Sequence, residues 1–318
     1  MTHSDAKASR FLSRRKFLAG SAGIGAAAAL RFPDARAAAD LLHTRPVPRT
    51  GERIPVVGLG TAIVFDIGED PARRAERRAV IQAMIDAGAR LIDTAPSYGT
   101  AETVLGDLLV EMRARDKLFI ATKVRVAGNE ATIAEMQQSL RRLRTPKVDL
   151  MQLHNVQDAG ETGAQLRVLR DWRDRGIIRY TGITHFQAGA YDRLAEVLKR
   201  ERPDFLQINY SLAERSAEQV LLPLAAETGT AVLVNLPFAR GRLFSAVRGR
   251  QLPEWAASFG ARSWGQFFLK YILAHEAVTC VIPGTDKPEY MADNLDAGRG
   301  NLPDAAMRRK MVEFWNSI

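Results

Sequence analysis

The stretch that decides the fold is Leu91-Ile-Asp-Thr-Ala-Pro-Ser-Tyr-Gly99, a short apolar strand that ends abruptly in an acid, a proline and a tyrosine. The two apolar residues supply the buried part of the strand, and Asp93 then stands at its carboxyl end. The proline and the glycine bound a turn that places Tyr98 on the same rim. The Asp93 carboxylate and the Tyr98 phenol have either a catalytic role or only a structural role in the turn. Which role applies depends on the residues that the other strands place beside them.

On both sides of this stretch, short apolar runs alternate with helical patterns at a regular spacing. This alternation is the signature of repeated strand-helix units and a parallel sheet. Eight units with no long linker predict a single-domain (β/α)8 TIM barrel over residues 40–318, with an extra helix at residues 305–315. The longest irregular connection is residues 240–259. The predicted strands cover residues 54–60, 91–94, 118–124, 148–154, 178–183, 205–209, 231–235 and 278–282. The predicted helices cover residues 74–87, 102–115, 132–143, 165–175, 191–200, 217–228, 264–275 and 288–297.

An open, doubly wound sheet is the alternative architecture. A dinucleotide-binding sheet of that kind needs a glycine-rich turn that leads from its first strand into a helix. The corresponding stretch here, Val57-Gly-Leu-Gly-Thr61, lacks the third glycine and is followed by Ala-Ile-Val-Phe instead of a helix start. The closed barrel is therefore preferred.

The charge of the chain is concentrated at its beginning. The 318 residues carry a formal charge of +9, from 45 basic and 36 acidic residues. Residues 1–39 hold seven of the basic residues and two of the acidic ones, so the remainder is 38 basic against 34 acidic residues, or +4. That balance gives no sign of a basic stripe for nucleic acid. Cys280 is the only cysteine, so no intramolecular disulfide can form.

Residues 1–39 have the pattern of an export signal. An arginine pair in Ser13-Arg-Arg-Lys-Phe-Leu18 precedes an apolar stretch at residues 18–30, which is shorter than the roughly 20 residues a bilayer span needs. A small-residue site, Ala37-Ala-Ala39, follows. The pattern resembles a bacterial twin-arginine signal and predicts folded export through that machinery to the periplasm, without stable membrane insertion. Cleavage is expected after Ala39, or else after Ala37. An uncleaved anchor or amphipathic helix is the alternative.

Chemically active side chains stand at three successive strand ends. The second strand provides Asp93 and, just beyond it, Tyr98; the third provides Lys123; the fourth provides His154. Barrel enzymes draw their catalytic groups from the carboxyl ends of several strands. Each residue alone has an ordinary structural explanation, as a cap, a solvated lysine or a hydrogen-bonded histidine. Their joint occurrence predicts a catalytic site.

The chain resembles the aldo-keto reductase superfamily over about residues 53–297. The resemblance implies a (β/α)8 barrel, a nicotinamide cofactor extended across the rim, and a catalytic tetrad of Asp93, Tyr98, Lys123 and His154. It rests on the opening stretch followed by Glu102 and Leu105-Gly106, and on Ala121-Thr-Lys-Val124, Val148-Asp-Leu-Met-Gln-Leu-His-Asn155, Gly182-Ile-Thr-His-Phe186, Gln207-Ile-Asn-Tyr-Ser211, and Ile282-Pro-Gly-Thr285 with Asn294-Leu295.

The chemistry of carbonyl reduction agrees with this tetrad. Hydride transfer from the cofactor builds negative charge on oxygen, which a proton donor and fixed positive charge must meet. We expect Tyr98 to be the general acid and Lys123 to lower its pKa. Asp93 would keep Lys123 charged and oriented, and His154 would hydrogen-bond the substrate oxygen.

The cofactor side is implied by the same resemblance. Thr184 and His185 take the place of the pair that holds the nicotinamide carboxamide, with Gln207 as their partner. Phe238 is the candidate for stacking on the nicotinamide, and a core phenylalanine is its alternative role. Other residues in the implied cofactor site are Gly60, Thr61, Arg240, Arg242, Gly284, Thr285 and Asn294. NADP is the expected cofactor, with NAD as the alternative because Asp286 would repel a 2′-phosphate.

The sequence therefore predicts an exported NAD(P)-dependent oxidoreductase that reduces a small aldehyde or ketone. A nucleotide-binding redox-sensing or regulatory barrel with little turnover is the alternative. A metal-dependent barrel hydrolase is disfavoured because the paired histidines of a divalent metal site are lacking, and no metal site is predicted. The pocket loops, at residues 62–71, 155–163 and 241–260, contain no decisive substrate anchor.

Overall fold

The computed structural model describes residues 41–318, and the predicted export signal lies outside this range. Eight parallel strands pair in the order β10-β9-β8-β7-β6-β5-β4-β3. Main-chain hydrogen bonds from Gly58 to Val281 (2.8 Å) and from Gly60 to Pro283 (3.1 Å) join the two ends of this sheet. The predicted (β/α)8 barrel is confirmed. The barrel strands are β3 (Leu59–Gly60), β4 (Leu91–Asp93), β5 (Phe119–Val124), β6 (Leu150–His154), β7 (Tyr180–His185), β8 (Phe205–Asn209), β9 (Ala231–Asn235) and β10 (Val278–Val281).

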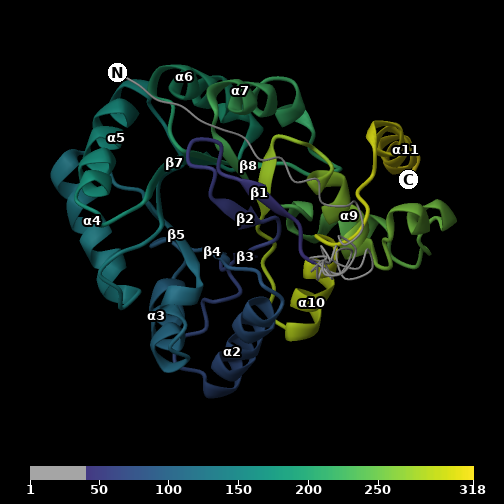
Figure 1. Ribbon diagram of the computed structural model, residues 1–318, viewed down its shortest axis with the longest axis horizontal. Helices are drawn as coiled ribbons and strands as arrows, with labels where there is room; N and C mark the ends of the chain where they lie inside the picture. The colour runs from purple at the N-terminus through teal and green to yellow at the C-terminus, as the bar shows by residue number, and fades with distance from the viewer. Residues whose placement is uncertain (1–40) are drawn as a thin grey trace, which may run out of the picture.

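The helices follow the strands around the barrel, as Figure 1 shows. Several begin at a side chain that caps the first turn: Asp70 accepts from the Arg73 amide before α2, and Ser263 accepts from the Gln266 amide before α9. The helices are α2 (Pro71–Asp86), α3 (Ala101–Glu111), α4 (Asn129–Arg142), α5 (Ala159–Asp174), α6 (Tyr191–Glu201), α7 (Leu221–Thr228), α8 (Arg242–Ala246), α9 (Trp264–Leu273), α10 (Pro288–Asp296) and α11 (Ala305–Asn316).

The prediction of one continuous first strand over residues 54–60 is wrong. β2 (Arg53–Pro55) pairs antiparallel with β1 (Thr44–Pro46), and only β3 joins the barrel. The hairpin ladder continues for one more hydrogen bond beyond Pro55, from the Val56 amide to the His43 carbonyl oxygen at 2.9 Å. The hairpin crosses the centre of the ring (Figure 1), and its residues Val47 and Ile54 join the apolar cluster inside the barrel.

Two further predicted elements differ in detail. The predicted helix at residues 217–228 begins as a 3₁₀ turn, Ser216–Glu218, and becomes α-helical only in α7. The predicted irregular connection at residues 240–259 contains the short helix α8 between two 3₁₀ turns, Ala239–Gly241 and Glu254–Phe259. Neither difference changes the order of strands or helices.

The barrel interior changes character along its axis. Successive side chains of a strand point to opposite faces, so residues two apart point the same way. On β4, β6 and β8 an apolar interior residue is followed two positions later by a buried polar one. Polar groups therefore gather at the carboxyl ends of the strands, above an apolar floor. These pairs are Leu91 and Asp93, Leu150 and Gln152, and Phe205 and Gln207.

Cys280 lies in the same apolar cluster of the barrel interior and is fully buried. Burial raises the pKa of its thiol above the ordinary value, so the thiol is not a nucleophile. Within residues 41–318, no helix combines the length and the apolar content that a membrane crossing requires.

Candidate active site

A buried ion pair forms the base of the site. Lys123 Nζ donates to Asp93 Oδ2 at 2.7 Å and to the Thr94 carbonyl oxygen at 2.8 Å, and Lys123 is completely buried. Burial alone would lower the pKa of Lys123, but the charge of Asp93 and the nearby Tyr98 raise it above the ordinary value. Lys123 is therefore a fixed positive charge inside the barrel.

Tyr98 lies directly above that charge. The Lys123 ammonium is 4.9 Å from the centroid of the Tyr98 ring. Burial raises the pKa of Tyr98, Lys123 lowers it, and Asp93 raises it further, with a net value above the ordinary one. Lys123 does lower the pKa of Tyr98, as expected, but desolvation of the phenolate outweighs the attraction of the ammonium, so the net shift is upward. The phenol is thus protonated at neutral pH.

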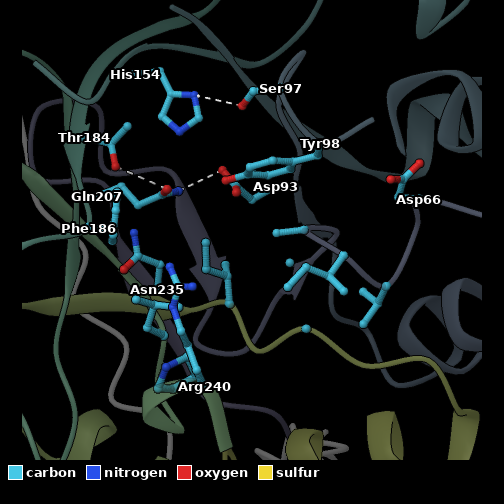
Figure 2. A pocket seen from close by; sticks show the side chains of 18 of the residues that line it. Asp66, Asp93, Ser97, Tyr98, His154, Thr184, Phe186, Gln207, Asn235 and Arg240 are labelled. Atoms are coloured by element: carbon cyan, nitrogen blue, oxygen red, sulfur yellow. Dashed lines mark hydrogen bonds between the residues drawn. The ribbon is translucent and has the colours of Figure 1, made fainter. Parts of the chain in front are cut away.

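His154 stands beside Tyr98 at the end of β6. The two rings meet edge to face, with centroids 5.9 Å apart and an interplanar angle of 87°. His154 Nδ1 is 3.5 Å from Ser97 Oγ, as Figure 2 shows. Burial and the charges of Lys123 and Arg125 lower the pKa of His154 to about 3. The imidazole is neutral at physiological pH and has one N–H to donate.

A chain of amide side chains holds Asp93 from the other side. Gln207 Nε2 donates to Asp93 Oδ1 at 2.7 Å, and Gln152 Nε2 donates to the same oxygen at 3.2 Å. Thr184 Oγ1 donates to Gln207 Oε1 at 3.3 Å (Figure 2). Asp93 therefore accepts from Lys123 on one oxygen and from two amides on the other. This arrangement fixes the orientation of the carboxylate.

A cavity of about 850 Å³ opens above these groups. Asp93, Tyr98 and His154 line it, whereas Lys123 lies beneath Asp93 and does not. Of the predicted cofactor residues, six line the cavity: Gly60, Thr184, Gln207, Phe238, Arg240 and Gly284. Among residues 41–318 no cluster of histidine, cysteine or acidic side chains is arranged to hold a metal ion.

Five predicted cofactor residues do not line the cavity. Thr61 is buried and donates to the Asp93 carbonyl oxygen at 3.0 Å. His185 follows Thr184 on the same strand and so points to the opposite face, where its Nδ1 accepts from the Gln187 amide at 3.1 Å. The others are Arg242, which is exposed on α8, Thr285, which bonds the Lys287 carbonyl oxygen, and Asn294, which is buried in α10.

The structure adds polar residues that the motif analysis did not single out. Gln152 supports Asp93, and Asn155, Asn235 and Arg125 line the cavity. The Oδ1 atoms of Asn155 and Asn235 are buried and have no hydrogen-bond partner among the described residues. The sequence did contain a signal for Gln152. It lies two residues before His154 on the same strand, and side chains two residues apart on a strand point to the same face.

Two loops of the cavity wall are tied to each other by Arg77. This arginine of α2 is 2% exposed, and it donates to the carbonyl oxygens of Val64 and Asp286, each at 2.7 Å. Val64 belongs to the loop after β3, and Asp286 to the loop after β10. One buried guanidinium thus links the loops that follow β3 and β10, the two strands at which the barrel closes.

Comparisons with known proteins agree with this geometry. The model described as "Aldo/keto reductase family" matches residues 56–310. The aldo-keto reductase YhdN of Bacillus subtilis is 30% identical over 209 residues, which cover 61% of this chain and 61% of the relative. The methylglyoxal reductase YeaE of Escherichia coli is 31% identical over 235 residues, or 72% of this chain and 80% of the relative. A crystal structure of an aldo-keto reductase from Klebsiella pneumoniae in complex with NADPH has a TM-score of 0.72 and 26% identity, covering 86% of this chain and 95% of that one.

A parallel barrel with a neutral phenol above a buried ammonium at its carboxyl end defines an oxidoreductase that acts on carbonyl groups. The chain belongs to the aldo/keto reductase family.

Proposed function

We propose that this protein reduces a small aldehyde or ketone to the alcohol with NADPH, with Tyr98 as the proton donor. The observation that carries the proposal is the position of the Tyr98 ring, 4.9 Å above the buried Lys123 ammonium and at the wall of the cavity. A phenol is a weak acid, and a fixed positive charge beside it stabilises the phenolate that proton donation leaves behind.

Each neighbouring group has a defined part in that proton transfer. Asp93 keeps Lys123 charged through the 2.7 Å ion pair. Neutral His154 donates its one N–H to the carbonyl oxygen and so orients the carbonyl toward Tyr98. The phenol then gives its proton to that oxygen as negative charge develops there.

The cavity fits a nicotinamide nucleotide. Two amide side chains, Asn155 and Asn235, face it with buried oxygens that have no partner among the described residues, and they suit a carboxamide. Phe238 offers an aromatic face, and Arg240 offers a guanidinium for the phosphates. The cofactor supplies the hydride to the carbonyl carbon.

Tyr98→Phe tests the proposed function. The variant should lose at least about a hundredfold in kcat with 4-nitrobenzaldehyde and NADPH, because a general acid contributes on that order. Its affinity for NADPH, measured by quenching of tryptophan fluorescence, should stay unchanged. Tyr191→Phe is the matched control, since that hydroxyl bonds the Asn209 carbonyl oxygen at 2.6 Å and does not line the cavity. Full turnover by Tyr98→Phe would exclude Tyr98 as the acid.

The choice between NADPH and NADH is tested separately. Fluorescence titration with both nucleotides should give a lower Kd for NADPH, and Arg240→Gln should weaken binding of both because it removes a phosphate contact. Equal or tighter binding of NADH would assign the protein to NAD instead.

We also propose that the chain is exported, folded, to the periplasm by the twin-arginine machinery. The arginine pair, the apolar stretch and the Ala37-Ala-Ala39 site support this. Replacement of Arg14 and Arg15 by lysine should retain the full-length chain in the cytoplasmic fraction of the expressing cells. Unchanged fractionation would reject the proposal.

A further inference from the structure

We propose that Arg125 selects carbonyl substrates that carry a carboxylate on the same small molecule. This inference rests on the proposed function, and it names a substrate class that the pocket loops alone did not indicate. Arg125 is the first residue after β5, the strand that carries Lys123, and it lines the active-site cavity.

The main chain holds Arg125 in place while its guanidinium has no partner. The amides of Arg125 and Val126 both donate to Glu135 Oε2, at 2.5 and 3.2 Å. Within the described part of the chain, the guanidinium itself has neither a hydrogen bond nor an ion pair. Its charge nevertheless reaches the active site, because it contributes to lowering the pKa of His154.

The charges in the cavity leave Arg125 available for an anion. Asp93 is paired with Lys123, and Asp66 accepts from the Thr100 amide and hydroxyl, both at 2.9 Å. The two lining arginines, Arg125 and Arg240, have no carboxylate partner among residues 41–318. The guanidinium groups of Arg125 and Arg240 are therefore both available to bind negatively charged groups of a ligand.

The strand order assigns these two cations to different ligands. Arg125 directly follows β5, whereas Arg240 comes from the loop after β9, four strands away around the closed ring, so the two arginines enter the mouth from different loops. Arg240 lies over the Phe186 ring at 5.6 Å, on the side proposed for the cofactor phosphates. Arg125 is on the side of Tyr98 and His154, where the carbonyl is reduced.

The same wall carries groups that suit a carboxylate. Ser97 and Asn155 line the cavity together with Arg125 and His154. A guanidinium binds a carboxylate through two parallel N–H bonds. Asp66 lies across Tyr98 from His154 (Figure 2), so it repels an anionic group on that side and favours its placement toward Arg125.

The test compares 4-oxobutanoate with its methyl ester, which has the same aldehyde and lacks the charge. The wild type should show a kcat/KM at least about tenfold higher for the carboxylate, as expected for a hydrogen-bonded charge pair. Arg125→Gln should abolish this preference mainly by raising KM for the carboxylate, with a much smaller change in kcat/KM for the ester, and Arg125→Lys should restore part of the preference. Added salt should raise KM for the carboxylate only. Arg141→Gln, which removes the charge of an exposed arginine on α4, is the matched control.

The outcomes separate this inference from the proposed function. Reduction of the ester with no carboxylate preference, or with a preference that survives in Arg125→Gln, would overturn the inference and leave the proposed function standing. If neither aldehyde is reduced, the proposed function fails, and calorimetric binding of butanoate against butanamide decides the role of Arg125. Tighter binding of butanoate that is lost in Arg125→Gln supports the inference, and equal binding of the two rejects it.

Discussion

Gly99 and Asp66 are in such close contact that a β-carbon on residue 99 would lie 2.4 Å from three atoms of the Asp66 carboxylate. The carboxylate cannot simply swing away, because Thr100 holds it through two hydrogen bonds of 2.9 Å. Gly99 also has a φ of +61°, which side chains disfavour. The position of Tyr98, one residue earlier, depends on this contact.

Gly99→Ala should therefore reduce kcat as well as stability. The left-handed backbone alone costs about 1–2 kcal/mol, and the clash adds displacement of Tyr98 from Lys123. Urea unfolding and steady-state kinetics measure the two effects. Gly51→Ala is the matched control, since φ is +72° there and no atom lies within 4 Å of the new carbon. Equal kinetic losses in both variants would contradict the argument.

Arg77→Met should destabilise the barrel by about 1–3 kcal/mol, because it leaves two half-buried carbonyl oxygens, on Val64 and Asp286, without this donor. The loss of the tie between their loops should also weaken nucleotide binding. Chemical denaturation and fluorescence titration measure these changes. Arg78→Met should change neither, since within residues 41–318 Arg78 itself pairs only with the exposed Glu111. Stability of Arg77→Met like that of wild type would refute the role of this tie.

Lys123→Met should cost about 3–5 kcal/mol of stability, since it leaves the buried Asp93 carboxylate without its counter-charge. Replacing both residues, as Lys123→Met with Asp93→Leu, should recover much of that loss without recovering activity. A double-mutant cycle in urea measures the coupling. Additive effects of the two substitutions would show that the ion pair contributes no coupling energy.

The neutral state of His154 predicts a pH dependence of stability. Its folded pKa of about 3 lies below the ordinary 6.5, so the folded state resists the proton that the unfolded state takes up. The stability contributed by the neutral imidazole is complete above pH 6.5 and declines as pH falls toward 3. Relative to His154→Gln, the wild type should lose about 1–2 kcal/mol between pH 7 and pH 5. A difference that stays constant with pH would show that His154 titrates normally.

The barrel and its four central polar residues could be predicted because strand ends and helix patterns are local features of sequence. Residue parity explains the main failure at the site. Thr184 and His185 are adjacent on β7, so they cannot both face the cavity, and only Thr184 does. The same rule, applied to β6, would have found Gln152 from His154.

Other features could not be predicted because they depend on burial and on contacts between residues that are far apart in the sequence. The pKa of Tyr98 results from desolvation set against two buried charges, and motif spacing does not measure burial. The division of the first predicted strand arises because the hairpin covers the end of the barrel, where Val47 and Ile54 find an apolar interior made by strands distant in sequence. The arginine tie at Arg77 likewise joins loops more than 200 residues apart, as its 209-residue separation from Asp286 shows.

The single thiol of the chain lies sealed in the apolar floor of the barrel, beneath the polar layer that holds Asp93 and Lys123. Neither the closure of the barrel nor the geometry of the site depends on a sulfur bridge. A change in the thiol–disulfide balance of the surroundings therefore makes or breaks no bond within the folded barrel, so a barrel folded in a reducing compartment needs no new cross-link in an oxidising one.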